Sequence, residues 1–97
     1  MKKVEVIIES SYLNRLLDLF HEGQVTGYTI IRDIEGAGGH GLKTADEAND
    51  ILSNTYVFTL CNEEKFNKMI EKITAFINKY GGKCIVLDAQ VLLHSKK

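Results

Sequence analysis

Residues 3–9 read KVEVIIE, and this run predicts the first strand of the molecule. Valine and isoleucine at positions 4, 6 and 8 alternate with glutamate, isoleucine and glutamate at positions 5, 7 and 9. A period of two in β-branched residues is typical of a strand with one buried face. The chain therefore begins with a strand, and the elements that follow must cover its apolar side.

Two amphipathic helices are expected to provide that cover. In the first, Ser10 and Ser11 offer hydroxyl caps, apolar side chains at positions 13, 16, 17 and 20 share one face, and the helix ends near Gly23. In the second, Asn62 is the predicted cap, and apolar residues recur at helical spacing from 66 to 80. Glycines at positions 81 and 82 end this second helix.

Three further strands are expected, because runs rich in β-branched and aromatic residues occur at 27–34 and 55–61, and a last apolar run extends from Cys84 through Leu93. The element order is βαββαβ. This order predicts an α+β, ferredoxin-like sandwich in which both helices lie on one face of an antiparallel sheet. Residues 1–97 form a single domain on this prediction, since the chain is close to the commonest domain size.

The other face of such a sheet has no helix to cover it. The strands carry more apolar surface than two helices on one face can cover. The residues that supply this surface include Val6, Ile8, Tyr56, Phe58 and Leu60. An exposed apolar face of this kind favours association with further copies of the chain. We therefore expect an oligomer.

Charge, hydropathy and cysteine content argue against several classes of protein. Twelve Lys and Arg against 13 Asp and Glu give a net charge of −1, which argues against a nucleic-acid partner. No long apolar run occurs at the start or elsewhere, so neither a signal peptide nor a membrane span is predicted, and a cytoplasmic location is expected. Cys61 and Cys84 lack a close pairing motif and are predicted to be reduced, packed thiols.

The connection between the second and third strands, residues 36–54, is much longer than a hairpin loop. Its first half, GAGGHG at 36–41, can present backbone N–H groups to an anion such as phosphate, or can act as a glycine hinge. The match to GxGxxG does not indicate a dinucleotide fold, because the motif neither follows the first strand nor opens a full helix.

The second half of this loop predicts a short helix from Thr44 to Leu52. Thr44 and Glu47 form a capping-box pattern, and Ala48, Ile51 and Leu52 give the helix a narrow apolar edge. That edge can pack on its own domain or lie against a partner.

Catalytic and metal motifs are not found in the sequence. His21, His40 and His94 stand far apart, and none of them falls in a metal-ligand spacing. There is no GxSxG, P-loop or HExxH motif. The sequence therefore predicts a protein that is not an enzyme.

Three segments carry a family resemblance. Residues 1–8 (MKKVEVII), residues 25–30 (VTGYTI) and the GAG at 36–38 resemble the PII signalling superfamily over nearly the whole chain. The Gly-Tyr-Thr start of the second strand is similar to the PII-like branch associated with bicarbonate transport. The resemblance implies a homotrimer of ferredoxin-like subunits whose sheets line the inside, and a loop at 36–54 that corresponds to the family's regulatory T-loop.

The resemblance also implies a ligand and two sets of residues. An adenine nucleotide (AMP, ADP, ATP or cyclic AMP) would bind between subunits as an effector, with no covalent cofactor. By position, the implied nucleotide-binding residues are Gly27, Tyr28, Thr29, Gly36, Ala37, Gly38, Gly39, Phe58, Gly82 and Lys83. The implied partner-binding residues of the loop are His40, Lys43, Thr44, Glu47, Ile51 and Leu52.

Departures from the nitrogen-regulatory branch bear on which nucleotide is expected to bind. Gly39 and His40 stand where that branch has Arg-Gln, residues 43–54 contain no tyrosine, and Lys96-Lys97 takes the place of a C-terminal Arg-x-Arg. Fewer fixed cations imply a weaker hold on a triphosphate, so AMP, ADP and cyclic AMP are as good candidates as ATP.

The implied function is signal transduction. The nucleotide-bound protein would regulate a membrane transporter or an enzyme, with bicarbonate as a candidate second ligand, and would be recruited to the membrane through that transporter. The alternative is a trimeric metal- or ion-responsive protein of the same fold that binds no nucleotide.

Overall fold

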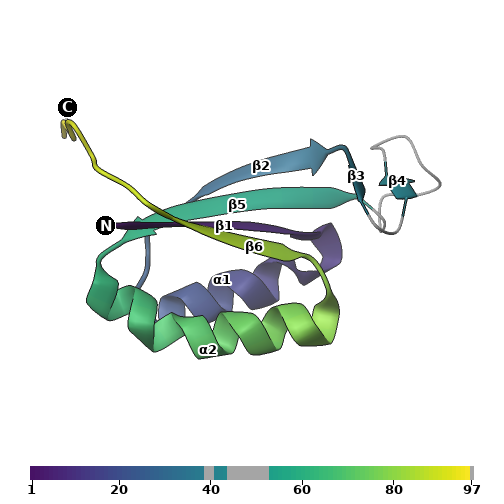
Figure 1. Cartoon of the computed structure of the whole chain (residues 1–97), viewed down its shortest axis with the longest axis horizontal. Coiled ribbons are helices and arrows are strands. Elements are labelled where there is room, and N and C mark those ends of the chain that lie inside the picture. Colours follow the sequence, from purple (N-terminus) through teal and green to yellow (C-terminus); the bar gives the residue numbers. More distant parts are fainter. Residues whose placement is uncertain (39–40, 44–52, 97) are drawn as a thin grey trace.

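The computed structural model describes residues 1–38, 41–43 and 53–96 (Figure 1). The strands are β1 (Lys2–Glu9), β2 (Thr29–Ile34), β3 (Gly36–Gly38), β4 (Gly41–Lys43), β5 (Asn54–Cys61) and β6 (Lys83–Asp88). The helices are a 3-10 turn η1 (Ser10–Tyr12), α1 (Leu13–Glu22) and α2 (Glu63–Tyr80).

The main sheet has the strand order β2-β5-β1-β6, and every neighbouring pair in it is antiparallel. Figure 1 shows α1 and α2 side by side on one face of this sheet, and none of the described residues forms a helix on the other face. This arrangement is the ferredoxin-like α+β sandwich, so the fold predicted from the sequence is confirmed.

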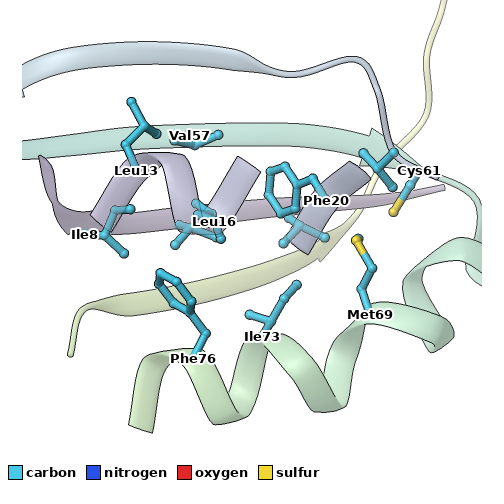
Figure 2. Close-up of a cluster of buried hydrophobic side chains, with 12 residues drawn as sticks. Ile8, Leu13, Leu16, Phe20, Val57, Cys61, Met69, Ile73 and Phe76 are labelled. Carbon is cyan, nitrogen blue, oxygen red and sulfur yellow. The ribbon is translucent and has the colours of Figure 1, made fainter. Parts of the chain in front are cut away.

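Strand alternation places the core between the sheet and the two helices. Val4, Val6 and Ile8 of β1 are at most 1% exposed, and their side chains lie on the same side as Val57 of β5. The helices close this layer with Leu13, Leu16 and Phe20 from α1 and Met69, Ile73 and Phe76 from α2 (Figure 2).

The face of the sheet that the helices leave open carries apolar residues, but they are not all the residues that the sequence predicts there. Val6 and Ile8 were expected there and are buried under the helices instead, because even-numbered residues of β1 point to the core. Tyr56, Phe58 and Leu60 of β5 do lie on the open face, since they pair with the odd-numbered residues of β1. The exposed apolar residues there are Ile31, Leu60, Ile85 and Leu87, between 38% and 49% exposed.

One predicted helix cap is confirmed and the other is wrong. The Asn62 side chain accepts a hydrogen bond from the Lys65 N–H at 2.8 Å, as a cap does. At the start of α1 no side chain caps the helix. The Ser10 hydroxyl shares a 2.6 Å hydrogen bond with Thr55 on β5 instead, and a 3-10 turn joins β1 to the helix.

The last strand, the second strand and the start of the long loop also differ from the sequence prediction. The last strand ends at Asp88, because the register with β1 stops where Lys2 faces Asp88, so residues 89–96 continue without a sheet partner. The second strand begins at Thr29 rather than position 27. The long loop opens with a small ribbon in which β3 pairs with β4, a feature that the sequence analysis did not predict.

Candidate functional site: a cleft at the start of β2

A cleft of about 390 Å³ lies where β2 begins. Four of the predicted nucleotide-binding residues line it: Gly27, Tyr28, Thr29 and Phe58. The rest of the wall comes from Met1, from Thr59 and Leu60 of β5, and from Val91, Leu93 and His94 of the C-terminal segment. The structure thus brings together two sequence segments, at 27–29 and 91–94, that are far apart in the chain.

The Thr59 hydroxyl fixes the chain where it enters β2. This side chain is 1% exposed, and it donates a hydrogen bond to the Gly27 carbonyl at 2.5 Å. Upstream, Val25 is buried, and its N–H donates to the Phe20 carbonyl at 2.9 Å. The turn between α1 and β2 is therefore held from both sides, which positions Gly27 and its neighbours at the cleft.

The two aromatic residues of the cleft are held by neighbouring rings and a cation. The Tyr28 ring lies 6.2 Å from that of Phe20 and 5.9 Å from the His21 imidazole, centroid to centroid. The Phe58 ring lies 5.9 Å from that of Tyr56, with the Lys3 ammonium 4.7 Å from its centroid. Such packing limits ring motion. The Phe58 ring lies on the open face and presents a flat apolar surface of the kind that a nucleobase can stack on, whereas the Tyr28 ring packs toward α1 and the core.

A polar cluster lies beside Phe58 on the open face. The Tyr56 hydroxyl donates to the Glu5 carboxylate, and the Lys3 ammonium lies 3.3 Å from the same carboxylate. The hydrogen bond from Tyr56, followed by that from Lys3, lowers the pKa of Glu5. Burial, and then the bond to Glu5, raises the pKa of Tyr56. The three groups satisfy one another beside the apolar side chains of the open face.

Three other predicted nucleotide residues, Gly36, Gly82 and Lys83, are not at the cleft. Gly36 begins β3, beyond the far end of β2, and Gly82 and Lys83 lead into β6 at the opposite edge of the sheet. Edge strands separated by two others are about 14 Å apart, so Thr29 and Lys83 of one copy cannot both contact one phosphate group. The predicted nucleotide residues therefore fall in separate places on one chain.

Position 82 requires a glycine, because the backbone of β1 passes close to it. Its φ is +108°, and a Cβ at this position would lie 2.5 Å from the Ile7 carbonyl oxygen of β1. A side chain there is excluded by both conformation and space. The turn before Lys83 is consequently packed directly against the central strand.

For the other predicted residues the structure describes the backbone alone or nothing. Ala37 and Gly38 belong to the backbone of β3, and Lys43 to that of β4. The predictions for Gly39, His40, Thr44, Glu47, Ile51 and Leu52, and the short helix predicted for 44–52, lie outside the described residues.

In the part of the chain that the structure describes, no group of three or more His, Cys, Asp or Glu side chains could hold a metal ion. Cys61 and Cys84 are free, as predicted, and burial raises the pKa of both thiols. None of the described helices combines the length and the apolar character that crossing a membrane requires.

The C-terminal contribution to the cleft is not predicted from the sequence. The sequence predicts a last strand that includes Val91 and Leu93, with His94 as an isolated histidine beyond it. A signal was present, because the alternation of Val91 and Leu93 puts both side chains on one side of an extended chain. The sequence could not say that this side faces residues 27–29.

Comparison with known proteins gives one family. The model of nitrogen regulatory protein P-II matches residues 1–95. CPII from Thiomonas intermedia K12, a PII-like protein solved with ADP, AMP and bicarbonate, is 28% identical, with a TM-score of 0.84 over 93% of this chain and 86% of that chain. Its apo form is 26% identical, with a TM-score of 0.73 over 93% and 89% of the two chains.

A PII-like signalling protein from Thermus thermophilus is 23% identical, with a TM-score of 0.70 over 89% of this chain and 83% of that chain, and it supports the fold alone. A comparison with curated protein sequences found no match.

Proposed function

The chain belongs to the P-II family of nitrogen regulatory proteins, and from this premise we propose that it is a PII-like signal-transduction protein that binds an adenine nucleotide between neighbouring copies. The observation that carries the proposal is the cleft at the start of β2. Four residues that sequence resemblance assigns to the nucleotide line it, and CPII has been solved with ADP and AMP.

The cleft suits the base end of a nucleotide. Its volume of about 390 Å³ is within the range of small-ligand pockets, roughly 300 to 1,000 Å³. The Phe58 ring and several aliphatic residues line it, while the exposed Thr29 offers a hydroxyl that can donate or accept a hydrogen bond. A flat heterocycle with polar edges matches that combination.

The phosphate end needs a second copy. Glycine-rich backbone at Gly36 and Gly82, together with the Lys83 ammonium, is the anion-binding chemistry of this chain, and it lies away from the cleft. A neighbouring copy can supply it. The exposed isoleucines and leucines of the open face also favour association, so we propose a homotrimer, the assembly that the family resemblance implies.

The signal passes to a partner protein on this proposal. With few fixed cations, the chain suits AMP, ADP or cyclic AMP at least as well as ATP. Bicarbonate is a candidate second ligand, because CPII was also solved with bicarbonate. We propose that the nucleotide state is reported through the 36–54 loop to a transporter or enzyme of inorganic-carbon metabolism. No observation on the described residues favours the metal-responsive alternative.

Calorimetry tests the ligand. Titration of the full chain with AMP, ADP, ATP and cyclic AMP, each with and without bicarbonate, should give saturable binding of at least one nucleotide. Thr29→Val should weaken that binding roughly fivefold, because it removes one hydrogen bond worth about 1 kcal/mol. Thr74→Val is the matched control, since Thr74 donates to the Ile70 carbonyl on α2, away from the cleft. Absence of binding by every adenine nucleotide would refute the proposal.

Light scattering tests the assembly. The full chain should have the mass of three copies at micromolar concentration. A monomeric mass with intact nucleotide binding would refute the shared site, because one copy would then suffice.

A further inference from the structure

The Phe58 ring has the cleft on one side and an ammonium group on the other. In the main sheet, β5 lies between β2, which begins at the cleft, and β1, which carries Lys3 (Figure 1). Phe58 is paired with Thr29 of β2 and with Glu5 of β1. The Lys3 ammonium lies 4.7 Å from the centroid of the Phe58 ring, and Lys3 is not among the residues that line the cleft. The cation therefore approaches the ring from the β1 side, while the cleft lies on the β2 side.

Glu5 and Tyr56 fix the position of this ammonium. The Lys3 ammonium lies 3.3 Å from the Glu5 carboxylate, which also accepts a hydrogen bond from the Tyr56 hydroxyl. The side chains of Lys3 and Glu5 are 30% and 19% exposed, so water screens this pair less than it screens a pair on the outer surface. The hydrogen bond to Glu5 raises the pKa of Lys3, which keeps the ammonium charged. The cation over Phe58 is thus held by a carboxylate that is itself held by a neighbouring tyrosine.

A cation held over an aromatic ring stabilises one orientation of that ring. An ammonium within about 6 Å of a ring centroid favours the contacting orientation about two- to fivefold at an exposed site. When a base stacks on only one orientation of the ring, its apparent affinity scales with the fraction of molecules in that orientation. Lys3 leaves the β2 side of the Phe58 ring free, so it can raise this fraction without occupying the place of the base.

We propose that Lys3 is a positioning residue of the nucleotide site, whose ammonium holds the Phe58 ring in the orientation on which an adenine base stacks. This inference rests on the proposed function and concerns how the same site is held. Glu5 acts one step further away, because it anchors the ammonium. Recognition of the base then depends on two residues of β1 that the base does not contact.

Calorimetric titration of the full chain with AMP, ADP, ATP and cyclic AMP tests this role. Lys3→Met removes the charge from a side chain of similar length, and it should weaken every nucleotide that binds by one common factor of about two to five. Lys3→Arg should retain the wild-type affinities, because a guanidinium also binds over an aromatic ring. The matched control is Lys68→Met, which removes an ammonium paired with Glu64 at 3.7 Å on α2 and should leave every affinity unchanged.

A double-mutant cycle separates an effect on the ring from an effect on the ligand. In the Phe58→Leu background the ring is absent, so Lys3→Met should cause no further loss of affinity. The same loss in both backgrounds would overturn the inference, since Lys3 would then act without the ring. A loss that grows from AMP to ATP would also overturn it, because it would indicate direct contact with the phosphates.

The remaining outcomes distinguish failure of this inference from failure of the proposed function. Unchanged affinity in Lys3→Met, or equal losses in Lys3→Met and Lys3→Arg, would overturn the positioning role while nucleotide binding by the wild-type chain stands. A wild-type chain that binds none of the four nucleotides would refute the proposed function together with the inference.

Discussion

Replacement of Thr59 by valine tests how the cleft is built. Valine has nearly the same shape as threonine, so the buried position remains filled and the hydrogen bond to the Gly27 carbonyl is lost. Gly27 is exposed, so water can reach its carbonyl and the cost falls at the lower end of the usual range, about 1 kcal/mol. For a domain of this length that corresponds to a fall in Tm of about 4 to 8 °C at fixed protein concentration.

A matched variant makes this prediction specific to the cleft. Thr55 lies on the same buried face of β5, four residues earlier, and its hydroxyl bonds to Ser10 at the other end of the strand. Thr55→Val should lower the Tm by a similar amount and leave nucleotide affinity unchanged. Thr59→Val should lower both, because the chain at Gly27 is no longer fixed. Thermal denaturation and calorimetry are the two assays, and equal nucleotide affinity in both variants would refute the positioning role of Thr59.

Three further outcomes are expected. Asn62→Ala should destabilise the protein by about 1 kcal/mol in urea denaturation through loss of the α2 cap, whereas Asn67→Ala on the exposed side of the same helix should not. The pKa of Glu5 is held below its ordinary value of 4.5 by the hydrogen bond from Tyr56. The contribution of Glu5 to stability is therefore present above pH 4.5 and is lost as the pH falls through the lower, folded-state pKa. Over that pH range the Tyr56→Phe variant should lose less stability than the wild type. Ile85→Glu puts a charge on the apolar open face and should shift the light-scattering mass toward the monomer, while an unchanged mass would exclude this part of the face from the interface.

Sequence periodicity predicted the fold because each signal is local. The alternation in β1 and the helical spacing in α2 both depend on neighbours within a few residues, and both were confirmed. The error over Val6 and Ile8 came from a different source. Their spacing shows that they share a face with Val4, but which of the two faces meets the helices depends on contacts with α1 and α2.

The candidate site was predictable in part for the same reason. Residues 27–29 and Phe58 were identified from resemblance to a family, and the register between β2 and β5 pairs Thr29 with Phe58. His94 could not be found in this way, because the end of β6 at Asp88 frees the segment that carries it. The Ser10 cap failed because Thr55, 45 residues away, competes for the hydroxyl. Contacts between distant segments decide both cases.

The separation of Thr29 from Lys83 across the sheet has a thermodynamic consequence. On the proposed shared site, a nucleotide bridges two copies and binds the assembled form more tightly than the isolated chain, so ligand binding and subunit association are linked by mass action. Dilution then weakens the apparent affinity, and saturating nucleotide lowers the protein concentration at which the assembly dissociates. A cell that contains more of this protein would therefore respond at a lower nucleotide concentration, so that abundance itself sets the threshold of the response.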